Sequence, residues 1–178
     1  MAGITFYNAY FPTIITALDT LEAILNSAQA HAKKNGIDVD TEYVPAKLYE
    51  DMLPLSFQIQ VVSNTLKKAV FRLTGAGAEA WEDNETTFDQ LFARIKKTKE
   101  LVKSVKPEDI NGKEGETTDV EIGPNILKTT HQSSITGFVL PNMFFHLQTT
   151  YAILRMKGVP LGKVVFLTPF LEPLGYKS

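Results

Sequence analysis

Residues 141–155 read Pro141-Asn-Met-Phe-Phe-His146-Leu-Gln-Thr-Thr150-Tyr151-Ala-Ile-Leu-Arg155, and they form the most informative segment of the chain. Its apolar residues recur at the intervals of a helix that buries one side, namely Phe144, Leu147, Tyr151 and Leu154. His146 and Thr150 lie one turn apart at the edge of this apolar seam. Pro141 is typical of a first helical turn, and Gly158 and Pro160 end the pattern. The sequence therefore predicts a buried helix with a histidine at its border.

Three further helices precede it, over residues 9–32, 52–73 and 87–105, each with apolar residues spaced three and four apart. Pro12 fits the first of them only in its first turn, which places the start near Tyr10. Thr87-Phe-Asp-Gln90 has the form of a capping box that opens the third. Four amphipathic helices in one chain predict an all-α bundle.

The helical pattern fails between the third helix and the last. Residues 120–122 and 126–128, separated by Gly123-Pro124-Asn125, predict a short β-hairpin there. His131 follows among threonines and serines, and we interpret it as a solvated loop residue. Residues 166–178 are expected to form an extended apolar tail that packs on the bundle or on a second chain. Residues 1–178 then make one domain.

Composition excludes several classes of protein. The 178 residues contain no cysteine, which excludes disulfides and cysteine-bound zinc. Eighteen basic and twenty acidic residues give a net charge of −2, so no overall charge directs the chain to nucleic acid or to an anionic membrane. The first 25 residues lack a basic region before their apolar run, and Asp19 and Glu22 interrupt it, so neither a signal peptide nor a membrane span is expected. We expect a cytoplasmic protein.

Three motifs resemble those of a bacterial and fungal domain-of-unknown-function family grouped with the DinB/YfiT-like superfamily. They are Asp51-Met-Leu-Pro54 with Gln58 and Gln60, Asp83-Asn-Glu85 with Phe88, and Pro141-Asn142 with Phe145-His146, continuing through Tyr151 and Arg155 to Gly162-Lys163. The resemblance covers nearly the whole chain, about residues 7–167. It implies a DinB/YfiT-like four-helix bundle in up-down-down-up order, and it implies no agreed activity.

The wider superfamily implies metal chemistry at a site with one histidine from the second helix and two, four residues apart, from the fourth. Only His146 matches this pattern, because Thr150 follows it and residues 52–74 contain no histidine. A single imidazole does not hold a divalent cation usefully. We therefore predict no metal and no other cofactor, and a metal-dependent transferase or isomerase with a degenerate site is kept as an alternative.

Polar residues beside the helix seams predict a binding site in the bundle core. His146 and Tyr151 are the candidates for acid–base catalysis, since imidazole is the usual proton shuttle near neutral pH. The candidate ligand-binding residues are Gln58, Asn64, Asn142 and Thr150. A small organic molecule is the expected partner, and whether the protein is an enzyme stays open.

Two other interpretations compete with the core pocket. The same polar groups would also serve to fix helix register if they bond to one another. A non-enzymatic homodimer, built through the apolar tail, is the alternative function. A solvent-connected cavity beside His146 would favour the pocket over the dimer.

His31 is assigned a different role from His146. The first two helices should run antiparallel, which would place the end of the first, with His31, near the start of the second, with Asp51. We predict a structural polar pair between His31 and Asp51.

Overall fold

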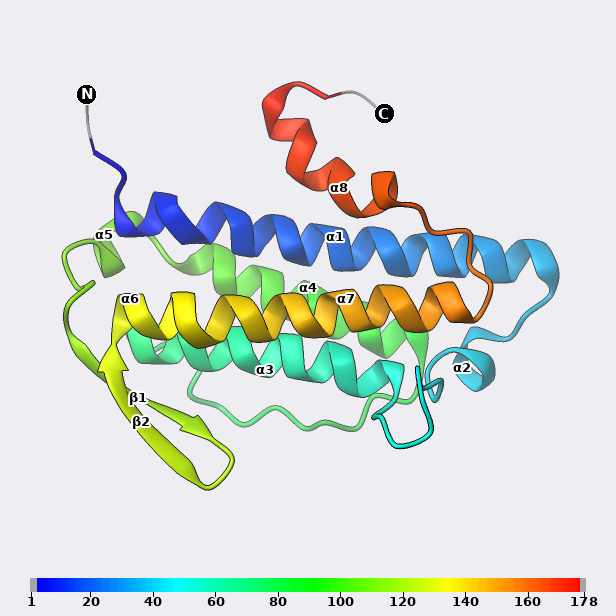
Figure 1. Ribbon diagram of the computed structural model, residues 1–178, viewed down its shortest axis with the longest axis horizontal. Helices are drawn as coiled ribbons and strands as arrows, with labels where there is room; N and C mark the ends of the chain where they lie inside the picture. Colours follow the sequence, from blue (N-terminus) through cyan, green and yellow to red (C-terminus); the bar gives the residue numbers. More distant parts are fainter. Residues whose placement is uncertain (1–2, 177–178) are drawn as a thin grey trace.

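Four long helices run side by side in the computed structural model, which describes residues 3–176 (Figure 1). They are α1 (Phe6–Asn35), α3 (Leu55–Thr74), α4 (Phe88–Ser104) and α7 (Leu140–Met156). α1 and α7 point in one direction, and α3 and α4 point in the other. This is the predicted up-down-down-up order. Of the seam predicted for the last helix, Leu147 and Leu154 are buried, whereas Phe144 and Tyr151 are only partly buried.

The core lies between these four helices, where their seams meet. Each helix contributes fully buried aliphatic residues, such as Leu21 of α1, Ile59 of α3, Leu91 of α4 and Leu154 of α7. Two short helices, α2 (Val39–Glu42) and α5 (Pro107–Ile110), close the two ends of the bundle. No helix among residues 3–176 is both long and apolar enough to cross a membrane.

The first helix begins earlier than its proline suggested. Thr5 caps α1, its side chain accepting a hydrogen bond from the backbone N–H of Asn8, so the helix starts at Phe6. Pro12 therefore lies inside the helix, and the expected start near Tyr10 is wrong. The capping box of α4 is confirmed, with Thr87 and Gln90 each accepting from the other's backbone N–H.

The last bundle helix is also longer than predicted. α6 (His131–Ser134), a π-helical turn η1 (Ile135–Val139) and α7 follow one another without a break. Pro141 is thus internal, and the wider π-helical turn directly before it accommodates a residue that has no N–H to donate. His131 is buried at the start of α6 and is not the solvated loop residue we expected.

A hairpin of β1 (Thr117–Ile122) and β2 (Asn125–Thr130) confirms the predicted pairing. Ile122 is opposite Asn125, and Gly123 turns the chain with a φ of 57° that favours glycine. The hairpin projects from the end of the bundle where α3 terminates (Figure 1).

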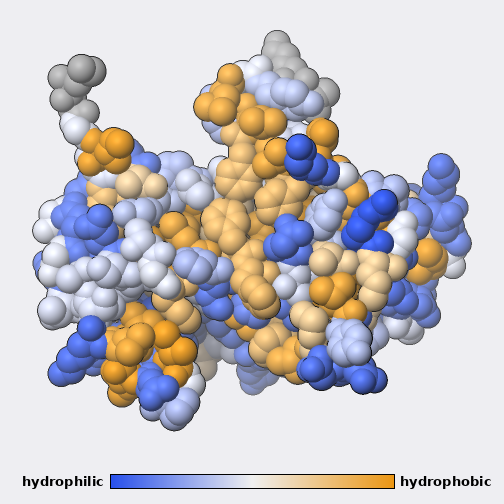
Figure 2. All heavy atoms as spheres, viewed as in Figure 1, coloured by the Kyte–Doolittle hydropathy of each residue, from blue (hydrophilic) through white to orange (hydrophobic). Residues whose placement is uncertain are grey.

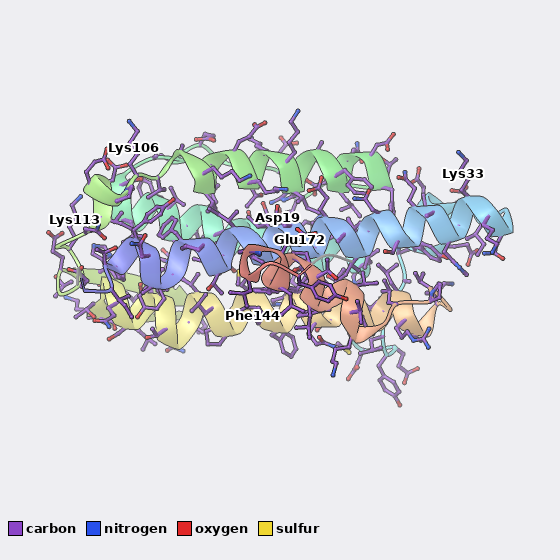
Figure 3. The ribbon with its side chains drawn as sticks, turned by 90° about the horizontal axis from the view of Figure 1, so that it is seen from above. Asp19, Lys33, Lys106, Lys113, Phe144 and Glu172 are labelled. Atoms are coloured by element: carbon purple, nitrogen blue, oxygen red, sulfur yellow. The ribbon has the colours of Figure 1, made fainter. Side chains whose placement is uncertain are left out.

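The C-terminal segment is helical, which corrects the expected extended tail. α8 (Lys163–Leu171) and the 3₁₀ turn η2 (Glu172–Leu174) lie across α1 and α7 (Figures 1 and 3). Phe170 packs against Phe144 of α7, with ring centroids 6.3 Å apart, and the Thr20 hydroxyl of α1 donates to the Phe166 carbonyl. The tail thus packs on its own bundle, although none of the residues of α8 is fully buried. Residues 177 and 178 of the predicted tail lie outside the described residues.

Candidate functional site

A histidine and a glutamine from two antiparallel helices meet at one side of the bundle. His146 of α7 and Gln58 of α3 approach to 2.7 Å between Nδ1 and Oε1. The Gln58 amide nitrogen donates to the carbonyl oxygens of Leu53, at 2.9 Å, and Pro54, at 3.3 Å. Carbonyl oxygens only accept hydrogen bonds, so these two contacts fix the orientation of the Gln58 amide.

The Gln58 orientation determines which nitrogen of His146 carries the proton. Because Oε1 of Gln58 only accepts, Nδ1 of His146 must donate. In the neutral ring, Nε2 then keeps its lone pair, and no residue among 3–176 forms a hydrogen bond with it. The contact therefore presents a basic nitrogen with a defined tautomer.

The local sequence explains why Gln58 reaches this position. Pro54 is the N-cap of α3, and the carbonyls of residues 53 and 54 lie at the start of the helix. Gln58 is the fourth helical residue, and its buried side chain folds back over this first turn.

The surroundings of His146 are apolar. Its ring meets those of Phe57 and Phe145 edge-on, with centroid distances of 6.2 and 5.2 Å. Burial lowers the pKa of His146 below its ordinary value of 6.5, because desolvation disfavours the imidazolium. The neutral ring is therefore the prevailing form at neutral pH. Phe145 and Leu53 at the border of this group are 60% and 49% exposed, so the group lies at the surface.

Two predicted residues follow His146 on α7 and have different environments. Thr150 is buried, and its hydroxyl donates to the His146 carbonyl at 2.9 Å. Its hydrogen bond thus stays within the helix. The Tyr151 hydroxyl donates to the Leu161 carbonyl at 3.0 Å, and its ring packs on Phe166. Tyr151 holds the connection to α8, and its hydroxyl makes no hydrogen bond with His146 among the described residues.

The two predicted asparagines join other contacts. Asn142 of α7 donates to the Thr65 hydroxyl of α3 at 2.8 Å, which fixes these helices against each other. Asn64 donates to both carboxylate oxygens of Asp83. Of the six residues predicted for the core site, the side chains of only Gln58 and His146 are hydrogen-bonded to each other.

Asn64 belongs to a partly buried network that was not predicted from the sequence. It is centred on Arg94 of α4, whose side chain is only 4% exposed. Nη1 of Arg94 donates to the Glu82 carbonyl and to Glu85, and Nη2 donates to Asn64 and contacts Asp83 at 2.7 Å. The acidic residues within 82–85, shortly before α4, were the feature of the sequence that could have indicated this network. The network holds the long loop between α3 and α4 against both helices.

His31 and Asp51 are not joined. The ring of His31 lies 3.3 Å from the side-chain nitrogen of Asn35, one turn later in α1. Within residues 3–176 no ion pair or hydrogen bond connects His31 with Asp51. The short helix α2 and the connecting chain after it lie between the end of α1 and the start of α3 (Figure 1).

The donors around His146 do not fit a metal ion. The Nδ1 of His146, the Gln58 amide and the Thr150 hydroxyl are all engaged in hydrogen bonds within the protein. Residues 3–176 contain no group of three or more histidine, aspartate or glutamate side chains placed to hold a metal. The side chains of His146, Gln58 and Thr150 therefore do not reproduce the three-histidine site that the superfamily resemblance implied.

Five cavities open on the described chain, and all five lie away from His146. Their volumes are about 330 to 750 Å³, and none of the five is lined by His146. The solvent-connected core cavity that would have favoured a core pocket is not among them.

The bundle and its hairpin define a DinB-like helical protein. The chain is similar to the crystal structure of a DinB family member protein from Shewanella denitrificans, with 29% sequence identity, 90% of each chain covered and a TM-score of 0.78. The family described as "Domain of unknown function (DUF1993)" matches residues 6–167, and the chain belongs to that family. Comparison with proteins of curated function finds no match.

Proposed function

We propose that the protein binds a small organic molecule at the surface around His146, without a metal ion. The observation that carries this proposal is the Gln58 contact, which leaves Nε2 of a neutral His146 as a free acceptor. A ligand for this group has an apolar body, to pack on Phe57 and Phe145, and one hydrogen-bond donor for Nε2. An alcohol or phenol has this chemistry.

The same geometry supports proton abstraction from a bound ligand. A neutral imidazole with one fixed N–H and one lone pair is a general base, and Gln58 stabilises its orientation. Gln58 is uncharged and offers less stabilisation to imidazolium than a carboxylate would. Binding is therefore the primary proposal, and proton transfer is its catalytic extension.

Phenol and toluene form a matched pair of probes, because they share the ring and only phenol donates a hydrogen bond. In an NMR titration we expect phenol to shift the His146 ring and the Phe145 backbone signals saturably. His146→Phe should weaken phenol binding by about tenfold, the loss of one hydrogen bond in an apolar site. Toluene should bind both proteins alike.

Thr150→Val is the matched control, because the hydroxyl of Thr150 is committed to the backbone of its own helix. It should leave phenol affinity unchanged. Equal affinity of phenol for the wild type and for His146→Phe would contradict the proposal.

A second candidate function, a homodimer through α8, has its own supporting observation. Apart from Lys163 and Thr168, every residue of α8 is apolar, yet none is buried in the single chain. Hydrophobic residues cover this helix in Figure 2. No charged residue stands between Lys163 and Glu172, so two copies of α8 can meet about a twofold axis without like charges in contact.

Sedimentation of the wild type and of Val164→Glu tests this dimer. Val164 is 56% exposed, so the substitution spares the fold of the monomer and places a charge in the interface. We expect a dimer for the wild type and a monomer for the variant. A monomeric wild type at high micromolar concentration would exclude it.

A further inference from the structure

A second polar site lies at the other end of α3, where the hairpin meets the helix. A cavity of about 370 Å³ opens between the last turns of α3, the chain at Gly77 and Ala78, and the two strands. Arg72, Phe71 and Ile126 are among its lining residues. Gln58 and Arg72 are fourteen residues apart on one helix, so the cavity is about 21 Å along the axis from the His146 site.

Arg72 is the distinctive side chain of this cavity. It is partly buried, and no described residue forms a hydrogen bond or an ion pair with it, although a guanidinium has five N–H donors. Burial lowers the pKa of Arg72, and the nearby charge of Glu121 only partly opposes this effect. Its place in the last turn of α3 lets the helix dipole offset some of the cost of this burial. Within the described part of the chain, its N–H groups therefore have no hydrogen-bond acceptor.

The other two cations that line the cavity, Lys67 and Lys68, already have partners. Lys68 forms an ion pair with Glu121 at 3.3 Å. Lys67 donates to the Glu79 carbonyl and lies over the ring of Trp81. Arg72 is therefore the cation that remains available to a ligand.

The cavity also offers apolar surface beside this cation. Phe71 is 47% exposed and Ile126 is 64% exposed, on opposite walls formed by the helix and the hairpin. Figure 2 shows hydrophobic residues gathered on the hairpin, at the lower left. Three cationic and two anionic side chains line the cavity, which leaves an excess of one positive charge. A singly charged ligand fits this excess better than a dianion.

We propose that this cavity binds a monocarboxylate with an apolar body, its carboxylate paired with the Arg72 guanidinium and its body between Phe71 and Ile126. Two parallel N–H···O bonds from arginine to a carboxylate are the strong, directional form of this contact. The site is separate from the His146 face and does not depend on the function proposed for it.

Octanoate is the probe, with octanol as its uncharged counterpart and acetate as its counterpart without an apolar body. In backbone NMR titrations of the full chain we expect octanoate to shift the signals of Phe71, Arg72 and Ile126 saturably. Octanol and acetate should bind at least tenfold more weakly. Arg72→Gln should weaken octanoate binding by about tenfold or more, as expected for the loss of a charged hydrogen bond.

Two further variants make the test decisive. Lys96→Gln removes one positive charge from an exposed position on α4, outside the cavity, and should leave octanoate affinity unchanged. Ile126→Glu changes an exposed residue, so the fold is kept, and its charge should repel the carboxylate and weaken binding by about tenfold. The proposal is overturned if octanoate causes no saturable shifts at these residues, or if it binds Arg72→Gln or Ile126→Glu as tightly as the wild type.

Discussion

Nδ1 of His146 and Oε1 of Gln58 are 2.7 Å apart, and they join the fourth helix of the bundle to the second. The glutamine is itself fixed by the carbonyls of Leu53 and Pro54. A neutral partner held in this way sets the tautomer of the histidine without stabilising its cation as a carboxylate would. The properties of His146 should therefore respond to the chemistry of residue 58.

Gln58→Glu should raise the pKa of His146. The carboxylate would favour the imidazolium, and it opposes the desolvation that lowers the pKa in the wild type. NMR titration of the His146 ring measures the shift directly. Gln58→Leu is the control, because it removes the hydrogen bond without adding charge, and it should not raise the pKa. An unchanged pKa in Gln58→Glu would mean that residue 58 does not govern the ring.

The stability of the protein should fall as the pH drops below 6.5, in part because of His146. Its pKa is lower in the folded chain than the ordinary value of 6.5, so the unfolded state binds a proton first. The contribution is fully present above pH 6.5 and is lost as the pH falls toward the folded pKa. Burial lowers the pKa of His131 as well, which adds a loss of the same sign.

Denaturant unfolding of the wild type and His146→Phe at about pH 7.5 and about pH 5 isolates the part due to His146. The variant should lose less free energy of unfolding between the two conditions than the wild type. An equal or greater loss in the variant would contradict the assignment of a lowered pKa.

Arg94→Met should destabilise the fold strongly. The substitution leaves Glu85, whose side chain is only 10% exposed, without its cation, and removing one partner of a buried pair costs about 3 kcal/mol or more. Asp83→Asn should cost much less, because the Asp83 side chain is 48% exposed. Denaturant unfolding gives both values, and Lys96→Met, at an exposed site, should change little. Similar losses for Arg94→Met and Asp83→Asn would show that burial does not set the strength of this network.

Tyr151→Phe should reduce stability by about 1 kcal/mol through the lost hydrogen bond to Leu161. It should leave the titration of His146 unchanged, because the Tyr151 hydroxyl bonds to the segment before α8. A shifted His146 titration would instead support the original pairing of His146 and Tyr151 as catalytic partners.

Deleting residues 166–178 should lower the melting temperature. The deletion removes Phe166 and Phe170, which pack on Tyr151 and Phe144 and cover part of the bundle. Because these rings are only partly buried, about 1–3 kcal/mol is expected for their combined contacts. Sedimentation of the same variant reports whether the oligomeric state changes. Unchanged melting and sedimentation would show that α8 contributes nothing to either.

Regular periodicity made the bundle predictable from the sequence. The seams of the long helices repeat over many turns, as with Leu18, Leu21 and Leu25 of α1, and Thr87 with Gln90 is a local capping signal. Gly123 and Pro124 marked the hairpin in the same way. Features encoded within a few neighbouring residues were therefore found.

Features that depend on contacts between distant parts of the chain were not predicted from the sequence. The helix α8 lacks a polar side and contains Pro169, so its sequence resembles an apolar tail, and packing on α1 and α7 decides its form. The Arg94 network joins residues up to thirty positions apart, and no periodic pattern in the sequence predicts it. Gln58 and His146 were both named as candidates, but their direct contact spans 88 positions and required the fold.

The π-helical turn at Ile135–Val139 also sets the angular phase of the helix that carries His146. Each residue advances an α-helix by about 100°, so one residue more or fewer in this turn would rotate everything before it by about that angle relative to α7. His131 is buried at the foot of the hairpin, and His146 contacts Gln58 farther along the same helix. In a uniform α-helix of the same length, the angle between His131 and His146 around the helix axis would be different. One of the two side chains would then point away from its present contacts. The π-helical turn thus sets the rotation between the two parts of this helix. The hairpin end and the His146 face can therefore each keep their own orientation around the bundle axis.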